Sequence, residues 1–301
     1  MNESALNEVL QHPDYMVLRR LPEKFEKRSY STFRRFSAII IDLETMGLDP
    51  RSHAIIELGL LKFSFTNEEG IIEVLDTYNS LNDPNMPIPE KITKITGITN
   101  EDVAGKKIDW DLISILLKDC NLVVCHNSAF DRNFLEIQTP DHIQELFKKI
   151  PFACTIKDID WFERGFESSK LDYLNWKLGF FYDGHRALTD CWATLNLLLH
   201  ETGAFDELKK NAKKIEILLC AVYAPYEKKE LLKERKYKWS DGTENLPKCW
   251  WVFVSIDDIE DEILFLEETI YCRKGAASNL PRSKTKITAH TRYSFRSENI
   301  N

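Results

Sequence analysis

The feature that most constrains this chain is an apolar run, Ala38–Ile41, followed directly by Asp42-Leu43-Glu44. Its three consecutive Ile residues predict a strand that is buried on both faces. Residues two positions apart share one face of a strand, so Asp42 and Glu44 project together where the buried strand ends. Two adjacent carboxylates repel each other unless a cation neutralises them, and all-oxygen ligation favours Mg²⁺ or Mn²⁺. The alternative is a strand end that reaches solvent, where acidic residues are ordinary.

Apolar segments of strand and helix type alternate after this first strand and predict an α/β fold. Two more strands, at 55–65 and 71–79, are expected in a meander with the first, because polar or Gly- and Pro-containing turns separate them. A short buried strand at 121–126 stands between two expected helices. The expected helices lie at 110–118, 130–138, 171–179 and 189–203, the last being closed by Gly203.

Two more acidic residues and one histidine stand at the edges of apolar elements. Asp131 lies in the first turn of the helix at 130–138, where a carboxylate also complements the helix dipole. Asp190 lies in the opening turn of the last apolar helix, and His185 lies five residues before it in a loop. Taken singly, helix capping explains Asp131 and solvent exposure explains His185. Together with Asp42 and Glu44, they indicate one catalytic site.

Charge and length divide the chain near residue 206. Residues 1–205 carry 22 basic and 32 acidic side chains, whereas 206–301 carry 18 and 16. At about 100 to 200 residues per domain, the 301 residues predict one large domain and one small one. We expect an N-terminal extension at 1–36, a domain with the acidic motifs at 37–205, and a small aromatic and basic α+β domain at 206–301. The net charge of −8 argues against a protein that coats duplex nucleic acid without sequence preference.

The segment 206–301 combines lysine-rich and aromatic stretches. We expect a lysine-rich helical stretch at 207–236, two aromatic strands around a polar turn at 237–255, a helix at 257–271, a basic loop at 273–286 and a strand at 286–296. Aromatic and basic side chains together can stack bases and neutralise phosphates of a single strand. The alternative is that Trp239, Trp250 and Trp251 form the core of a small domain. Seven basic residues and one acid follow Ile270, so this end is where we expect any nucleic acid strand to be guided.

The cysteine pattern and the apolar content bear on location. Seven cysteines without a CxxC pair indicate neither a zinc ribbon nor a disulfide framework, and they favour a reducing compartment. The N-terminus lacks a signal-peptide pattern, and no run approaches the roughly 18 apolar residues that a membrane span needs. We therefore expect a cytoplasmic protein with no membrane segment.

Three segments, IIDLETMGL, CHNSAFDRNFL and HRALTDCWAT, resemble the three motifs of the DnaQ-like (DEDDh) 3′-to-5′ exonucleases, which include proteins like the DNA polymerase III epsilon subunit. The resemblance covers about residues 36–203 and extends to HAIIELGLLKF and PIPEKITKITGIT. One departure is Thr96, which stands where many relatives have a His before Gly-Ile-Thr. The resemblance implies an α/β ribonuclease H-like domain with a mixed five-stranded sheet flanked by helices.

The resemblance also implies roles for single residues. It assigns His185 as the base that takes a proton from the attacking water. It places Thr45, Met46 and Leu48 against the terminal nucleotide, and Asn127 and Phe130 around its pocket, where local hydrogen bonding and core packing are the alternatives. Arg186 contacts a phosphate or, alternatively, pairs with a local acid. The ligands of two Mg²⁺ ions, for which Mn²⁺ can substitute, are Asp42, Glu44, Asp131 and Asp190.

These features predict a metal-dependent 3′-to-5′ exonuclease that releases nucleoside 5′-monophosphates from single-stranded ends, with DNA favoured over RNA. Two alternatives stay open: an exoribonuclease in RNA processing, and an accessory proofreading or nucleic-acid-binding subunit that acts through a polymerase or other protein partner bound by 206–301. A P-loop is absent, and Glu44 stands where an aspartyl-phosphate enzyme would have Asp. Cys125 lies in an apolar strand and is expected in the core rather than as a nucleophile.

Overall fold

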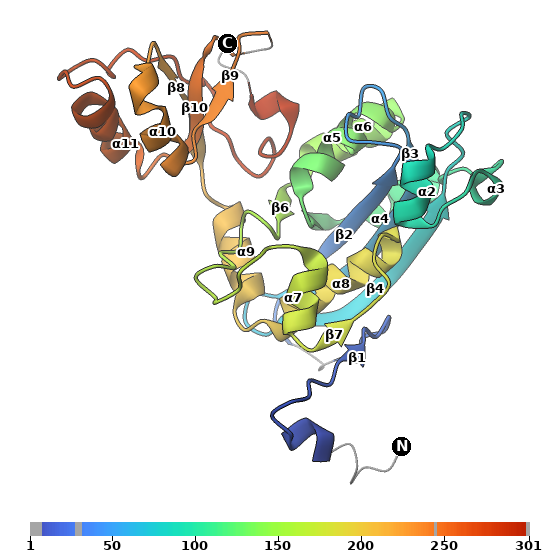
Figure 1. The fold of residues 1–301 in the computed structure, drawn as a ribbon. Helices are drawn as coiled ribbons and strands as arrows, with labels where there is room; N and C mark the ends of the chain where they lie inside the picture. Colours follow the sequence, from blue (N-terminus) through green and yellow to red (C-terminus); the bar gives the residue numbers. More distant parts are fainter. Residues whose placement is uncertain (1–7, 28–31, 244–245, 299–301) are drawn as a thin grey trace. The chain divides into compact units, whose positions relative to one another are not determined.

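The computed structural model describes residues 8–27, 32–243 and 246–298. The chain divides into two compact units, Met1–Asn211 and Ala212–Asn301, hereafter unit 1 and unit 2 (Figure 1). The boundary expected at 205/206 falls inside helix α9 (Ala204–Ala212), which ends unit 1. No helix among the described residues is both long and apolar enough to cross a bilayer.

A five-stranded sheet forms the centre of unit 1, in the order β4-β3-β2-β5-β6 (Figure 1). Strands β2, β3 and β4 are antiparallel neighbours, whereas β5 and β6 continue the sheet in parallel with β2. The predicted α/β fold with a mixed five-stranded sheet is therefore confirmed. The strands are β2 (Phe36–Thr45), β3 (Ile55–Thr66), β4 (Gly70–Leu81), β5 (Cys120–Cys125) and β6 (Phe152–Cys154).

The central position of β2 explains its apolar sequence. This strand pairs with β3 on one side and with β5 on the other, and Ile39, Ile40 and Ile41 are completely buried. A strand covered on both faces reads as a continuous apolar run rather than an alternating one. The first charged side chains of β2 therefore come where the strand emerges from the core, at Asp42 and Glu44.

Helices flank this sheet. Helix α8 (Ala187–His200) packs across β2, β3 and β4, and ten of its fourteen residues are buried, which accounts for apolar side chains on nearly all its sides. Helix α5 (Ser128–Gln138) contacts β2, β5 and β6. The other helices of unit 1 before α9 are α2 (Glu90–Thr96), α3 (Asn100–Val103), α4 (Trp110–Leu117), α6 (Asp141–Lys149) and α7 (Leu171–Lys177).

The described part of the N-terminal extension joins a second, two-stranded sheet. Strand β1 (Arg19–Arg20) runs parallel to β7 (Phe180–Phe181), the short strand before α8. Leu21, which follows β1, is only 5% exposed. The described part of the extension is thus anchored on unit 1.

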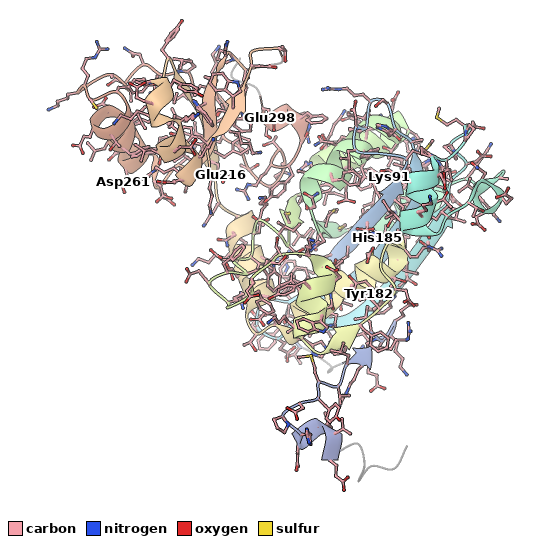
Figure 2. All side chains as sticks on the ribbon, in the orientation of Figure 1. Lys91, Tyr182, His185, Glu216, Asp261 and Glu298 are labelled. Carbon is pink, nitrogen blue, oxygen red and sulfur yellow. The ribbon has the colours of Figure 1, made fainter. Side chains whose placement is uncertain are left out.

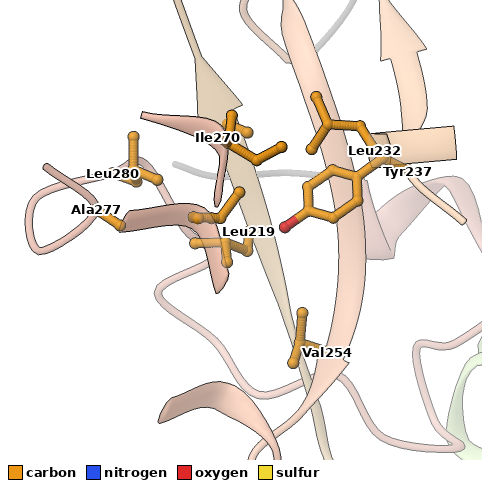
Figure 3. Close-up of a cluster of buried hydrophobic side chains, with 9 residues drawn as sticks. Leu219, Leu232, Tyr237, Val254, Ile270, Ala277 and Leu280 are labelled. Atoms are coloured by element: carbon orange, nitrogen blue, oxygen red, sulfur yellow. The ribbon is translucent and has the colours of Figure 1, made fainter. Parts of the chain in front are cut away.

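Unit 2 is built on an antiparallel sheet in the order β8-β10-β9. Leu219, Tyr237 and Val254 belong to a cluster of buried side chains beside this sheet (Figure 3). This arrangement is the expected small α+β unit. Its elements are β8 (Glu216–Val222), η1 (Tyr226–Lys228), α10 (Lys229–Glu234), β9 (Lys238–Ser240), β10 (Cys249–Ser255), α11 (Ile259–Phe265), η2 (Leu266–Ile270) and η3 (Phe295–Ser297).

Two expected elements of unit 2 are wrong. The lysine-rich stretch 207–236 is not helical throughout, because its middle forms β8, whose successive residues Leu218 and Leu219 enter different core clusters. The expected strand at 286–296 is instead a series of turns that ends in η3. There the guanidinium of Arg292, 4% exposed, donates to Glu216 and to the carbonyl of Lys214, and this buried anchor favours a compact turn over a strand.

The aromatic residues of unit 2 divide between the two roles considered for them. Trp251 is 6% exposed and belongs to a core cluster. Trp239 is 51% exposed and lies edge-on to Trp250 at a ring distance of 5.4 Å. Core formation therefore accounts for Trp251, whereas Trp239 is accessible.

Candidate active site

Asp42 and Glu44 lie on one face of β2, as the spacing predicted. In the antiparallel register, Asp42 is opposite Gly59 and Glu44 is opposite Glu57 on β3. The register shifts immediately after Glu44, which marks a bulge. Bulges redirect side chains and end regular pairing, so the strand turns away from the sheet directly after its two carboxylates.

Gly59 allows helix α8 to approach these carboxylates. A Cβ atom at this position would lie 2.3 Å from the carbonyl carbon of Ala187 and 2.4 Å from the amide nitrogen of Leu188. Any side chain on β3 at this point would therefore push the first turn of α8 away. Because Gly59 pairs with Asp42, the contact holds Asp190, in that same first turn, next to the end of β2.

The pKa values of the β2 carboxylates show how little compensates their charge. Burial raises the pKa of Asp42 well above its ordinary value, and the nearby carboxylates of Asp190 and Asp131 raise it further. The pKa of Glu44 rises to about 8, again chiefly through burial, with Asp190 adding to the effect and Arg186 opposing it. Like charges held together in a poorly solvated place disfavour ionisation of each other.

Asp131 and Asp190 approach this pair from two helices. Asp131, in the first turn of α5, is 2% exposed, and burial raises its pKa although backbone hydrogen bonds oppose the rise. Asp190, in the first turn of α8, is 8% exposed, and burial raises its pKa to about 6. Both helix starts therefore deliver an acid to the end of β2.

His185 completes the group from the loop before α8. Its φ of 64° lies in the left-handed region that non-glycine residues seldom adopt, and its backbone N–H donates to Oδ2 of Asp190 at 2.9 Å. Its side chain is exposed. One potential ligand atom from each of Glu44, His185 and Asp190 lies within 4.8 Å of the others. The structure thus brings together all five residues that the sequence singled out.

The chemistry of this group fits a hard divalent cation. The described part of the chain places no Lys or Arg in an ion pair with Asp42, Asp131 or Asp190. Four convergent carboxylates offer the oxygen ligands that Mg²⁺ and Mn²⁺ prefer. A bound cation would also relieve the repulsion that raises their pKa values.

The residues expected to contact substrate differ in accessibility. Met46 is 6% exposed, packs with Ile56, and its N–H donates to the carbonyl of Ala54 at 2.9 Å. Thr45 is 7% exposed, and its hydroxyl donates to the carbonyl of Gly47. Leu48, by contrast, is 84% exposed and free to meet a ligand.

Asn127 and Phe130 stand where α5 begins, beside Asp131. Asn127 is exposed, with a φ of 91°, and makes no side-chain capping bond to the helix. Phe130 is partly buried against Phe134, with ring centroids 4.9 Å apart. An accessible amide and a half-covered ring thus border the acidic group.

Two residues of this site were not anticipated from the sequence. Glu57 is completely buried and accepts hydrogen bonds from Arg186, from the N–H of Ala187 and from Asn79. Arg186 therefore pairs with a local acid, the alternative considered for it. A lone Glu within the apolar segment IIELGLL was a signal that could have identified Glu57, since a fully buried acid requires partners.

Tyr182 is the second unanticipated residue. Its ring lies beside the Asp190 carboxylate, next to Gly184, and burial raises its pKa far above the ordinary value for tyrosine, with the charge of Asp190 raising it further. Tyr182 and His185, labelled in Figure 2, belong to the same loop. No local pattern marked Tyr182, because the contact depends on how that loop folds back onto α8.

Comparisons with a family profile and with individual proteins point to the same family. The sequence profile of the RNase T exonuclease family matches residues 39–198. The chain is 30% identical over 164 residues to DNA polymerase III subunit epsilon of Aquifex aeolicus, which covers 54% of this chain and 78% of that protein. It is 31% identical over 172 residues to the PolC-type DNA polymerase III of Thermotoga maritima, which covers 56% of this chain.

The extent of these matches is limited. The chain spans only 12% of the length of the Thermotoga maritima polymerase. A solved structure of exonuclease X in complex with 5′ overhanging duplex DNA covers 57% of this chain and 92% of its own, with 23% identity and a TM-score of 0.40. The family match includes all five residues of the acidic site and excludes strand β1 and unit 2.

Proposed function

Because the chain belongs to the RNase T family of exonucleases, we propose that it is a metal-dependent 3′-to-5′ exonuclease. Its proposed substrate is a single-stranded 3′ end, DNA in preference to RNA, and its products are nucleoside 5′-monophosphates. The observation that carries the proposal is the convergence of four carboxylates and one imidazole at the end of β2. The preference for DNA is supported by the likeness to a DNA polymerase III subunit.

In this proposal the acidic residues hold the metal and the histidine moves a proton. Asp42, Glu44, Asp131 and Asp190 would hold two Mg²⁺ ions, with Mn²⁺ as a substitute. When bound, such ions polarise the phosphoryl group and favour hydroxide formation from water. His185 takes the proton from the attacking water, and its exposed loop position leaves its ring accessible to a bound strand end.

The proposed binding residues distinguish a strand end from an internal bond. Leu48 has an exposed apolar side chain that can stack against a terminal base, while Asn127 and Phe130, at the start of α5, are proposed to contact the terminal nucleotide. The side chains of Thr45 and Met46 are engaged within the protein, so their proposed contribution is to shape the chain between β2 and Leu48. Arg186 is held by Glu57, and its role is to fix the loop rather than to bind a phosphate.

The test uses 5′-labelled DNA and RNA oligonucleotides with Mg²⁺, and compares the wild-type protein with Asp42→Ala. We expect a ladder that shortens from the 3′ end, nucleoside 5′-monophosphates as products, and no ladder from the variant. If neither substrate is degraded by the wild-type protein, the enzyme proposal is wrong. Degradation of a 3′-blocked oligonucleotide would contradict the direction, and faster cleavage of RNA would favour the exoribonuclease alternative.

The likeness to a polymerase subunit favours a second candidate function, a proofreading subunit that binds a polymerase. In that case unit 2, which lies outside the family match, is the proposed contact. Size-exclusion chromatography of the full chain with a replicative polymerase catalytic subunit tests it. Co-elution that is lost when only surface residues of unit 2 are changed would support this candidate, and separate elution would contradict it.

A further inference from the structure

The loop that carries His185 is held firmly at one end. This segment, residues 181–186, runs from the last residue of β7 to the start of α8. At its far end, the guanidinium of Arg186 donates to the buried carboxylate of Glu57 at 2.9 Å. The intervening residues Asp183, Gly184 and His185 are exposed, and His185 has a positive φ. A loop with so little buried surface needs a second anchor to keep one conformation.

Strand β1 supplies that second anchor. The N–H of Arg19 donates to the carbonyl of Gly179, and the N–H of Leu21 donates to the carbonyl of Phe181, each at 2.9 Å. Leu21 is 5% exposed, so its side chain fixes the strand to unit 1. The backbone on which the His185 loop begins is therefore hydrogen-bonded to a segment 160 residues earlier in the chain.

Side chains of the same segment reach both the loop and helix α8. The guanidinium of Arg20 lies 3.0 Å from Oδ2 of Asp183 and 4.8 Å from the ring centre of Phe181. Glu23 accepts a hydrogen bond from the hydroxyl of Thr189 at 3.0 Å. Thr189 immediately precedes Asp190, so residues 19–23 contact the chain on both sides of His185.

Both side chains of the Arg20–Asp183 pair are mostly exposed, so the pair contributes little to global stability. Its effect is geometric, because it fixes which way the loop faces. Neighbouring residues of an extended segment point to opposite sides. With Phe181 and Asp183 held by Arg20, Tyr182 between them points to the other side of the segment, where its ring lies close to the Asp190 carboxylate.

Gly184 keeps this arrangement compact. A Cβ atom at Gly184 would lie 3.5 Å from the Tyr182 ring and 3.7 Å from Oδ1 of Asp190, so the loop backbone passes directly beside both groups. The Asp190 carboxylate then receives the N–H of His185 through its other oxygen. The Tyr182 ring and the His185 backbone thus both lie against the Asp190 carboxylate.

We propose that residues 19–23, which lie outside the family match, are a positioning element of the active site. By pairing with β7 and contacting Asp183 and Thr189, they set the Tyr182–His185 loop against Asp190. This inference rests on the proposed function, because it concerns turnover at that site. It assigns the segment an effect on the catalytic step rather than on folding or on substrate affinity.

The test compares the full-length double variant Arg20→Gln/Glu23→Gln with the wild-type protein. The matched control is Lys24→Gln/Glu26→Gln, which removes the same charges from exposed side chains of the neighbouring turn. We expect the first variant to lose about tenfold in kcat, since small displacements of a catalytic group are costly, with KM and Tm nearly unchanged. Its pH–rate profile is expected to change on the acid side, and amide hydrogen exchange at 181–186 is expected to accelerate.

Further variants separate positioning from folding. Replacing Arg20 by Lys keeps a cation near Asp183 and is expected to restore most of kcat. Equal activity of the two double variants would overturn the proposal, as would a loss of activity that follows a loss of Tm. If the wild-type protein proves inactive, the proposed function fails, whereas unchanged hydrogen exchange at 181–186 in the first variant contradicts the positioning element itself.

Discussion

Asp190, beside the end of β2, and Glu262 of unit 2 are buried to the same degree but are compensated differently. Asp190 and Glu262 are each 8% exposed. Glu262 accepts hydrogen bonds from the Tyr237 hydroxyl at 2.8 Å and from the Arg235 guanidinium at 2.7 Å. Asp190 receives the backbone N–H of His185, yet its charged neighbours include further carboxylates.

Glu262 stabilises the fold through its ion pair, whereas the carboxylates around Asp42 destabilise it and are held in place by the surrounding structure. Glu262 has its own guanidinium, which in turn lies 4.2 Å from the ring centre of Phe265, so its charge belongs to a closed local network. The group around Asp42 has no such cation among the described residues and keeps its carboxylates together at a cost to stability. A divalent cation bound from solution would reduce that cost.

Asp42→Asn gives the largest expected effect and separates activity from stability. The amide keeps the shape of the carboxylate without its charge, so we expect hydrolysis to slow about a thousandfold or more through loss of a metal ligand. In a chelator, the free energy of unfolding is expected to rise, because Asp131 and Asp190 lose a like-charged neighbour. Single-turnover rates and urea denaturation measure the two effects. A variant less stable than the wild-type protein in chelator would contradict the comparison.

A titration in the acid range examines the partly buried His126, which the fold keeps neutral. Burial lowers the pKa of His126 to about 4. In the unfolded chain a histidine titrates near pH 6.5, so between about pH 6.5 and 4 the unfolded state binds a proton that the folded state does not. The free energy of unfolding therefore carries no penalty from His126 above pH 6.5. Below that pH protonation of His126 in the unfolded state lowers it, by roughly 3 kcal/mol at pH 4.

Replacement of His126 by Asn should flatten this part of the stability profile, as measured by denaturation at several pH values. The exposed His142, replaced in the same way, is the control and should leave the profile as it is. If both variants retain the full slope between pH 6.5 and 4, other groups cause the acid sensitivity.

Metal addition is expected to stabilise unit 1 selectively. At a Mg²⁺ concentration about 100 times its Kd, binding to the folded state alone contributes roughly 2.7 kcal/mol. Calorimetry should show a shift in the unfolding of unit 1 but not of unit 2, and a much smaller shift in Asp42→Asn. Equal stabilisation of the wild-type protein and this variant would place the binding elsewhere.

Local patterns predicted the elements near the active site well because their causes are local. The alternation that puts Asp42 and Glu44 on one face, and the helix starts at Asp131 and Asp190, depend on a few neighbouring residues. The contacts of Glu57 with Arg186 and of β1 with β7 span 129 or more residues, and no short pattern encodes them. These contacts are visible only in the folded structure.

Unit 2 shows the opposite case, in which local patterns misled. The residues of β8 stand between lysine-rich stretches that favour helix, but their burial on both sides of the sheet overrides that preference. The alternation at 286–296 is typical of a strand, yet Arg292 draws the segment into turns. Tertiary burial decided both outcomes.

Glu262→Gln tests the paired acid of unit 2, and its expected effect is smaller than those at the Asp42 group. The amide cannot satisfy Arg235 as a carboxylate does, so we expect unit 2 to lose about 1 to 2 kcal/mol of unfolding free energy. The value is moderate because the Arg235 side chain is 44% exposed and water can replace part of the interaction. Denaturation followed by tryptophan fluorescence measures it. A gain in stability, as expected for Asp42→Asn in chelator, would remove the distinction between the two sites.

The smallest expected effect concerns the basic end of unit 2, where Arg282, Lys284 and Lys286 are exposed while Ser283 is buried. The segment is fixed to β8, since the Ser283 N–H donates to the carbonyl of Leu218 at 2.9 Å. If these side chains guide a single strand, their joint replacement by Gln should lower the salt dependence of binding, d log K/d log[salt], by about 2. Fluorescence anisotropy with an inactive Asp42→Asn background measures it.

A matched triple replacement separates guidance from general charge. Lys213, Lys233 and Lys236 are also exposed, and their replacement by Gln removes the same net charge from other segments of unit 2. If both triple variants lower the salt dependence of binding equally, only the net charge of unit 2 matters. Unchanged binding with reduced solubility of the variant at Arg282, Lys284 and Lys286 would assign these basic residues to solubility rather than to guiding a strand.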